Sequence, residues 1–333
     1  MIPKLPTRLR CVAVTCALLV LCFGVANPAQ AGPDSWRYAW PKTDFSKTSV
    51  DFDEIISGGP PKDGIASIDA PEFVAVAEAT DLAATEPVIG LVVAGDARAY
   101  PLRILIRHEI VNDTVGGIPV AVTYCPLCNS AVVFDRRVAG EATEFGTTGK
   151  LRNSDLVMYD RTTESWWQQF LGEAIVGVRT GTRLKVLPAR LESWERFAAR
   201  FPEGRVLVAK ASLWNSYGTN PYVGYDTARR PFLYFGDFPD NIPPMARVVA
   251  IGNQAWALAL LRERGRIESG DLVLSWEPGQ NSALDSRDIP KGRDVGNVVV
   301  QRRGAEGLAD TPYDVTFAFV FHAFHPEGVW YLE

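Results

Sequence analysis

The sequence predicts a mostly β protein with short strands and a few peripheral helices, with an α+β fold as the alternative. Its apolar runs are short, rich in Val and Ile, and separated by turns of Gly, Pro, Asp and Asn. Only one segment of the first half, residues 191–202, has its apolar residues clearly spaced for one face of a helix. The chain of 333 residues is long enough to bury a large core without disulfide bonds.

The first 31 residues have the layout of a secretory signal peptide. Lys4, Arg8 and Arg10 precede the apolar run CVAVTCALLVLCFGV, and NPAQA offers a cleavage site after Ala31. The apolar run of 15 residues is shorter than the roughly 20 residues that a membrane-spanning helix needs. We therefore expect a periplasmic or secreted protein that has no stable membrane insertion once residues 1–31 are removed.

Removal of the signal peptide changes the charge and the cysteine count. The mature chain has 31 basic and 39 acidic residues, a net charge of −8, which argues against a nucleic-acid partner. Three of the five cysteines (Cys11, Cys16 and Cys22) leave with the signal peptide, and Cys125 and Cys128 remain. A CxxC pair in an otherwise cysteine-free chain of this size favours chemistry over structural stapling.

The first half of the mature chain reads as an arm followed by hairpins. Residues 32–70 are rich in Pro, Gly, Asp and Ser and are expected to form an extended N-terminal arm, followed by a single β-rich domain over residues 71–333. A Gly-Asp turn predicts a hairpin over residues 87–100. GGIPVAVTY predicts a strand that ends at Cys125, and the run after the cysteines predicts a hairpin over residues 129–149 with Ala-Gly at its tip.

The second half continues the β pattern. Short strands separated by Thr and Gly turns are predicted between residues 156 and 191, followed by the helix over residues 191–202. Residues 212–245 are rich in aromatic residues, Pro and Gly, and are expected to form a long ordered loop. The alternating aromatic run VTFAFVFHAFHP predicts a strand over residues 315–325 that is stopped by Pro326.

Two short motifs recur in the same order. GDARAYPL in the first half is echoed by GNQAWALAL, and NSAVVFDR is echoed by NSALDSR. The repetition predicts two related β units, at about residues 85–210 and 245–333. The second unit has EPGQ in place of the CxxC, so any chemistry of the cysteines belongs to the first unit.

Cys125 and Cys128 define the first candidate site. A redox CxxC of the thioredoxin type begins a helix, whereas NSAVVFDRR, which follows here, is strand-like. Two thiolates three residues apart can instead bind one metal ion, with imidazoles as further ligands. The leading hypothesis is a copper or zinc centre, in a copper-handling protein or a metal-dependent enzyme. The sequence does not identify a small-molecule or metal-delivery partner.

The mature chain has three histidines to complete such a centre: His108, His322 and His325. His108 precedes Cys125 by 17 residues, a distance that one strand turn can close. Three residues apart on a strand, His322 and His325 face opposite sides, although on a helix they would share one face. Because His325 lies on the face of the phenylalanines, we predict Cys125, Cys128, His108 and His325 as the metal ligands.

Two other hypotheses remain open for the cysteines. A thiol-disulfide redox protein would oxidise the pair reversibly and bind no metal. A carbohydrate-binding or cell-surface-binding module would use it as a structural disulfide, and the aromatic residues from Trp214 to Phe238 favour this third hypothesis.

A polar and aromatic stretch over residues 145–170 is the second candidate site. In it Arg152 can grip an anion and Asp160 can act as an acid, a base or an orienting group, and we add Glu109 as the third predicted catalytic residue. The alternative is a turn-rich surface with an Asp-Arg pair. The common hydrolase and nucleotide-binding signatures (GxSxG, HExxH and a phosphate-binding glycine loop) are missing.

The segments HEIVND, TYCPLC and LVMYDR resemble the bacterial domain of unknown function 3179, and the resemblance covers roughly residues 65–330. The resemblance implies that ten residues belong to one recurrent unit: His108, Glu109, Asn112, Asp113, Cys125, Cys128, Ser130, Asp155, Asp160 and Trp166. The tail AFHP resembles the family's ending, which favours His325 over His322. The family carries no settled activity, so the resemblance implies a site without its reaction.

Overall fold

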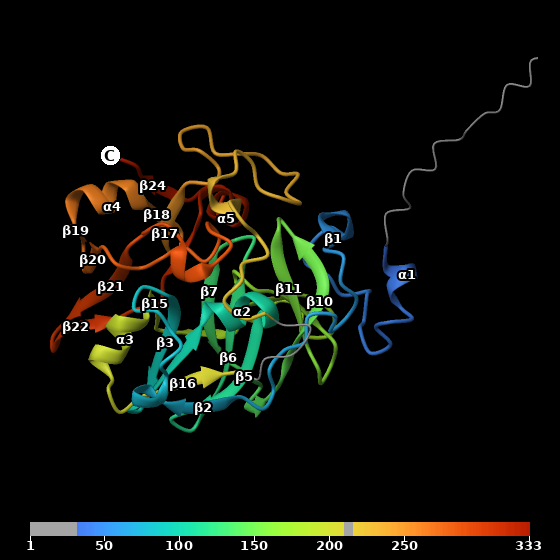
Figure 1. Ribbon diagram of the computed structural model, residues 1–333. Coiled ribbons are helices and arrows are strands. Elements are labelled where there is room, and N and C mark those ends of the chain that lie inside the picture. Colours follow the sequence, from blue (N-terminus) through green and yellow to red (C-terminus); the bar gives the residue numbers. More distant parts are fainter. Residues whose placement is uncertain (1–31, 210–215) are drawn as a thin grey trace, which may run out of the picture. The chain divides into compact units, whose positions relative to one another are not determined.

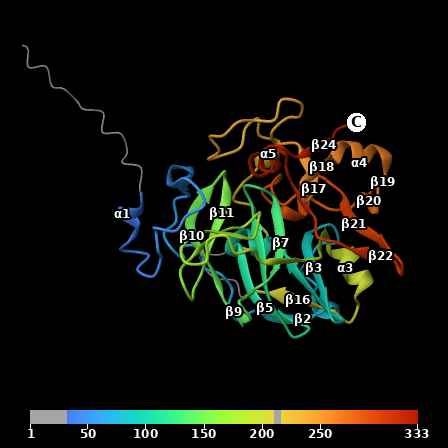
Figure 2. The ribbon, with the colours of Figure 1, turned by 180° about the vertical axis from the view of Figure 1, so that it is seen from behind.

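The computed structural model describes residues 32–209 and 216–333 (Figures 1 and 2). Strands take up 41% of the residues and helices 15%, which confirms the predicted mostly β fold. The predicted signal peptide, with its three cysteines, and Trp214 lie outside the described residues. Within the described part of the chain, no helix is long and apolar enough to span a membrane.

The described residues form five short α-helices, namely α1 (Pro33–Trp36), α2 (Leu102–His108), α3 (Trp194–Arg200), α4 (Leu258–Arg264) and α5 (Ala318–Phe324). The 3₁₀ turns are Phe52–Glu54, Val76–Glu78, Tyr225–Thr227 and Ile289–Lys291. The last four α-helices each have seven residues and follow a strand directly. Helices of this length are not stable alone, so packing against the sheets holds them.

The five larger sheets form a propeller-like arrangement. The arm sheet has the order β1 (Ile55–Ser57), β10 (Phe145–Arg152), β11 (Asp155–Asp160), β12 (Trp166–Gln168), β13 (Glu173–Val176). The cysteine sheet has the order β14 (Lys185–Leu187), β7 (Ser130–Asp135), β6 (Ile118–Cys125), β5 (Ile110–Val115). Both faces of β7 and most of β6 are buried, which explains their nearly continuous apolar sequence.

Two further sheets are built around hairpins, and a third lies beside them. The first hairpin sheet has the order β15 (Ala189–Ser193), β3 (Pro87–Val93), β4 (Asp96–Pro101), β16 (Arg205–Val208), β2 (Glu72–Ala75). The second has the order β23 (Asp314–Phe317), β17 (Arg247–Ile251), β18 (Gln254–Ala257), β24 (Val329–Tyr331). The remaining four-stranded sheet has the order β19 (Arg266–Ser269), β20 (Leu272–Glu277), β21 (Asn297–Gly304), β22 (Gly307–Asp310).

The two hairpin sheets share one topology. In each, the hairpin lies between two strands that a short helix connects, β15–α3–β16 or β23–α5–β24. The strand before that helix pairs antiparallel with the hairpin, and the strand after it pairs parallel. A helix and an antiparallel meander follow each hairpin, α2 with β5–β7 and α4 with β19–β21. The two related units remain a prediction about common origin, which this shared topology supports.

The N-terminal residues pack onto the arm sheet. Trp36, Trp40 and Phe45 are buried and surround Trp166, with ring centroids 5.1, 5.2 and 5.4 Å from its own. Strand β1 also pairs with β10 at the edge of this sheet. The N-terminal residues therefore supply part of the core on this side of the fold.

Three predicted elements differ in the structure. The hairpin over residues 87–100 is confirmed as β3 and β4. The predicted hairpin over residues 129–149 is wrong, because its two long strands, β7 and β10, belong to different sheets. The Ala-Gly turn instead connects the short strands β8 (Arg137–Val138) and β9 (Glu141–Ala142). The predicted helix over residues 191–202 is shorter and begins at Trp194, after β15.

The predicted strand over residues 315–325 is also wrong beyond Phe317, since residues 318–324 form α5. Four consecutive residues of α5, from Ala318 to Phe321, are buried. A short segment that is apolar on every side has no period that separates a strand from a helix. His322 and His325 consequently do not alternate between the faces of a strand.

The N-terminal aromatic cluster gives a stability prediction. Trp40→Ala should lower the free energy of unfolding by about 3–5 kcal/mol, because Trp40 is 3% exposed and packs on Tyr159 and Trp166. Tyr38→Ala, two residues away at a side chain that is 98% exposed, should change it by less than about 0.5 kcal/mol. Urea unfolding measures both, and equal effects would show that the N-terminal residues do not pack as described.

Candidate metal centre

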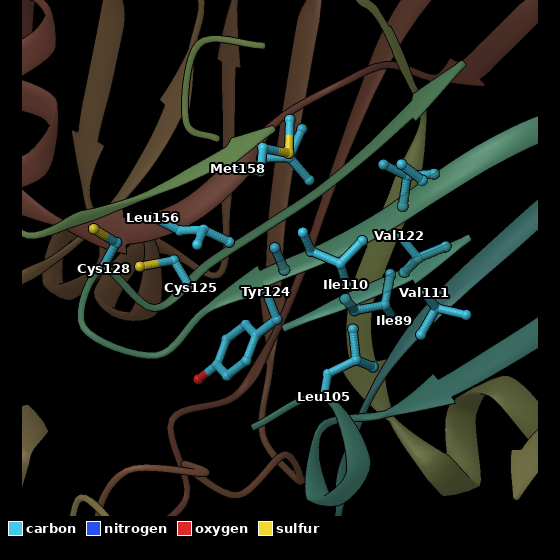
Figure 3. Packing of buried hydrophobic residues seen from close by; sticks show 14 of the residues in the cluster. Ile89, Leu105, Ile110, Val111, Val122, Tyr124, Cys125, Cys128, Leu156 and Met158 are labelled. Carbon is cyan, nitrogen blue, oxygen red and sulfur yellow. The ribbon is translucent and has the colours of Figure 1, made fainter. Parts of the chain in front are cut away.

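A tight turn between β6 and β7 positions the two cysteines. Cys125 ends β6 and pairs with Ser130, and the Cys128 amide donates a hydrogen bond to the Cys125 carbonyl oxygen over 3.2 Å. Asn129 completes the turn with a φ of +51°, a conformation that Asn tolerates better than most residues. Figure 3 shows the two sulfur atoms side by side at the end of the packed strands, near Leu156. A strand follows the CxxC directly, so neither cysteine lies at the start of a helix that the motif itself begins.

A second turn, between β10 and β11, carries Asp155 to the same place. Asn153 and Ser154 both have positive φ, +53° and +64°. The Ser154 carbonyl oxygen accepts both thiols as weak hydrogen bonds, from Cys125 over 3.8 Å and from Cys128 over 3.5 Å. These strained backbone positions bring the start of β11 against the cysteine turn.

Asp155 has one satisfied and one unsatisfied oxygen. Its Oδ2 accepts hydrogen bonds from Gln168 Nε2 over 2.6 Å and from the Phe170 amide over 2.9 Å. Its Oδ1 is buried and has no hydrogen-bond partner within the described residues. A carboxylate oxygen of Asp155 and the sulfur atoms of Cys125 and Cys128 all lie within 4.8 Å of one another. Two thiols and a carboxylate at this separation can ligate one metal ion.

Burial controls the protonation of this group. Cys128 and Asp155 are 0% exposed and Cys125 is 2% exposed. Burial raises the pKa of both thiols, that of Cys128 well above its ordinary value. Burial also raises the pKa of Asp155 to about 6, although hydrogen bonds from Phe170 and Gln168 oppose the shift. Without a metal, both thiols are therefore protonated at neutral pH.

Two more buried carboxyl groups lie around the centre. Burial and then the nearby charge of Asp155 raise the pKa of Glu109 to about 8. Glu109 in turn contributes to the raised pKa of the Cys125 thiol. Burial raises the pKa of Asp314 to about 7, and this residue accepts a hydrogen bond from the Ala131 amide next to the cysteine turn. Both groups hold protons at a pH at which exposed carboxyl groups are ionised.

Strand β23, from the far end of the chain, supports the cysteine turn. Thr316 Oγ1 and the Phe317 amide donate hydrogen bonds to the Cys128 carbonyl oxygen, over 2.8 and 3.3 Å. Asn129 Nδ2 donates to the Val315 carbonyl oxygen over 2.6 Å. The second half of the chain thus fixes the turn on which the cysteines stand.

The structure places the two predicted histidine ligands outside the ligand group. His108 contacts the Ala66 carbonyl oxygen with Nδ1 and the Tyr217 hydroxyl with Nε2, over 2.7 and 2.8 Å, so both ring nitrogens are occupied. His325 directly follows α5 as its C-cap, and its ring centroid lies 6.0 and 5.2 Å from those of Phe170 and Phe321. Burial lowers the pKa of His325.

His325 and Asp155 both contact Phe170, so this histidine is a neighbour of the centre and not a member of it. His322 lies one helical turn before His325, on α5. Among the described residues, the group of potential ligands consists of the two thiols and the Asp155 carboxylate.

The three predicted catalytic residues are separated. Glu109 lies beside the centre. Arg152 forms an ion pair with Glu54 over 2.7 Å and contacts Gln168 over 3.4 Å, so it supports the glutamine that holds Asp155. Asp160 is completely buried and accepts hydrogen bonds from Thr163 and Trp167, which makes it the anchor of its own turn.

Sequence reasoning placed Asp155 in the polar stretch and in the recurrent unit but did not place it beside the two cysteines. Its available signal is an acidic residue that directly precedes the apolar run LVMY, on a strand whose residues are all buried. A buried acid at the start of such a strand needs a partner, and no Lys or Arg follows for several residues.

The raised pKa of Glu109 predicts a pH-dependent stability of the metal-free protein. Folding raises this pKa from 4.5 to about 8, so between these values the folded state keeps a proton that the unfolded state has lost, and stability falls as pH rises. Glu109→Gln removes the cost and should exceed the wild type in free energy of unfolding at pH 8, by at least about 1 kcal/mol, and match it near pH 4.

Urea unfolding with a chelator present measures this effect. Glu141→Gln, at an exposed position in β9, is the matched control and should follow the wild type at every pH. Parallel pH profiles of Glu109→Gln and the wild type would contradict the burial of a protonated Glu109.

Comparison with known proteins agrees with the resemblance seen in the sequence. No curated protein and no solved structure matches the chain. A family model described as "Protein of unknown function (DUF3179)" matches residues 62–328, which include Cys125, Cys128, Asp155 and Glu109. Because the match covers most of the sequence, the chain belongs to the DUF3179 family of proteins of unknown function.

Proposed function

We propose that this protein is an exported metal-binding protein that holds one ion with Cys125, Cys128 and Asp155. Export is proposed from the signal-peptide pattern of the first 31 residues. One observation carries the metal proposal: two free thiols and a carboxylate oxygen come within 4.8 Å of one another, while Asp155 Oδ1 has no partner among the described residues. A cation at this point would satisfy that oxygen.

The ligand set favours zinc over copper. Thiolates bind both Zn²⁺ and Cu⁺, whereas a carboxylate oxygen is a common ligand of zinc and a poor one of a soft monovalent ion. Three protein ligands leave one position of a tetrahedron open. Glu109 is not among the three, but its carboxyl responds to the charge of Asp155, so it can take up or release a proton near the centre.

The burial of the three ligand residues favours metal binding over catalysis on a large substrate. The three ligand residues are at most 2% exposed, so a large substrate cannot reach the open position. A metal-dependent enzyme remains compatible with a substrate as small as water. We therefore assign the protein a metal-binding role and leave its reaction open.

Metal titration of the thiol-reduced protein tests the assignment. The wild type should bind one equivalent of Zn²⁺, more tightly as pH rises, because two thiols with raised pKa must lose their protons. Cys125→Ser, Cys128→Ser and Asp155→Asn should each lower the affinity by at least about 100-fold, since each removes a direct ligand.

Asp135→Asn is the matched control. Asp135 is 6% exposed and ends β7, the strand that follows the cysteine turn, and its carboxylate pairs with Arg137. This variant should bind zinc like the wild type. Equal affinities of Asp155→Asn and Asp135→Asn would contradict the ligand role of Asp155.

A thiol-disulfide function is the second candidate, because the same two sulfur atoms lie within bonding reach after a small movement. The raised pKa of both thiols argues against it, since attack on a disulfide needs a thiolate. We expect the metal-free protein to react with oxidised glutathione far more slowly than a model thiol at pH 7, measured by mass spectrometry. A fast and reversible reaction would favour the redox function.

A further inference from the structure

Residues 216–246, which precede β17, contact the CxxC turn of the proposed metal centre. Figures 1 and 2 show this yellow to orange loop beside α5 and above β11. Tyr222 and Tyr225 of the loop pack against the core cluster that contains both cysteines. The Tyr225 hydroxyl donates a hydrogen bond to the carbonyl oxygen of Leu127, inside the CxxC turn, over 2.9 Å. The loop is therefore in direct contact with the turn that carries the thiols.

One part of this loop is anchored firmly and the next part is not. The amides of Asn220, Gly224 and Tyr225 donate to backbone oxygens of residues 284–287, over 2.8, 2.7 and 3.1 Å. In residues 229–242, by contrast, the backbone hydrogen bonds to other described parts of the chain are those of Phe232. A segment with so few backbone hydrogen bonds opens at a low free-energy cost.

Phe232 ties this weakly held segment to the centre by two hydrogen bonds. Its amide donates to the Tyr225 hydroxyl over 3.3 Å, and its carbonyl oxygen accepts from Ser154 Oγ over 2.6 Å. The same Ser154 receives both cysteine thiols on its carbonyl oxygen. The tie therefore joins the CxxC turn, the Asp155 turn and the segment.

The side chains of the segment do not all resist its opening. Phe232 is 60% exposed and Phe235 is 83% exposed, so neither loses much apolar burial when the segment moves. Tyr234 is buried against Phe319, and Leu233 and Phe238 are partly buried on the core. These contacts, together with that of Ile242 on a neighbouring hydrophobic cluster, close the segment again after it opens.

We propose that residues 229–242 are a cover that opens to give small reagents and metal ions access to Cys125, Cys128 and Asp155, with the hydrogen bonds of Phe232 as its latch. The claim that a metal ion is what naturally enters the site rests on the proposed function. The cover itself does not, because it governs access to the thiols whether or not they bind a metal.

The test is the rate at which a disulfide reagent such as 4,4′-dithiodipyridine modifies the two thiols of the metal-free protein under native conditions. Tyr225→Phe keeps the ring that packs on Phe317 but loses the hydroxyl that bonds Leu127 and Phe232. Loss of these bonds should raise the rate about threefold to tenfold. Ser154→Ala should raise it similarly through the other bond of the latch.

Tyr222→Phe is the control, because Tyr222 packs on the same core and its hydroxyl makes no hydrogen bond to the described residues. Its rate should equal that of the wild type. Equal rates for Tyr225→Phe and Tyr222→Phe, or thiol modification that occurs only at the rate of global unfolding, would overturn the cover. If Tyr225→Phe raises the rate of thiol modification but the protein binds no metal, the proposal of a cover is supported and the proposed metal-binding function is contradicted.

Discussion

The Asp155 carboxyl is completely buried, and only its Oδ2 is hydrogen-bonded to other described residues. A buried polar atom without a partner costs roughly 1–3 kcal/mol, and more when it is charged. This unfavourable burial occurs beside two buried thiols, and hydrogen bonds from Gln168 and the Phe170 amide hold the carboxyl in one orientation. The remaining features of the centre, its raised pKa values and its strained turns, follow from placing these three groups together in the core.

Backbone strain is concentrated at the same place. Of the nine described non-glycine residues with positive φ, four (Glu109, Asn129, Asn153 and Ser154) lie at or next to the centre. In the second of the two predicted β units, Glu277 pairs with Asn297 at the place where Cys125 pairs with Ser130 in the first unit. A long connection follows Glu277, where the first unit has the tight CxxC turn. The second unit contributes β23, which holds the cysteine turn from outside. One half of the chain thus carries the three proposed ligands, and the other half supports the turn on which the cysteines lie.

Much of this architecture was predictable from local sequence. Val-rich and Ile-rich runs between turns predicted the strands, and NSAVVFDRR predicted a strand after Cys128, which already argued against a thioredoxin-like pair. The segment from Ala318 to Phe324 was predicted as a strand but forms a helix, because it is almost entirely apolar and has no period that separates the two structures. The scarcity of histidine made His108 and His325 the predicted ligands, but it says nothing about where a ring lies, and the structure groups Cys125 and Cys128 with Asp155. Asp155 was missed because its position depends on two left-handed residues before it and on Gln168 across the sheet.

The central claim is the identity of the three ligands, and X-ray absorption at the zinc edge of the loaded protein tests it most directly. The account predicts two sulfur scatterers at about 2.3 Å and oxygen scatterers at about 2.0–2.2 Å, without the outer-shell pattern of imidazole. In Asp155→Asn the oxygen shell should weaken while both sulfur scatterers remain. A first shell with imidazole scattering, or one without sulfur, would contradict a centre made of Cys125, Cys128 and Asp155.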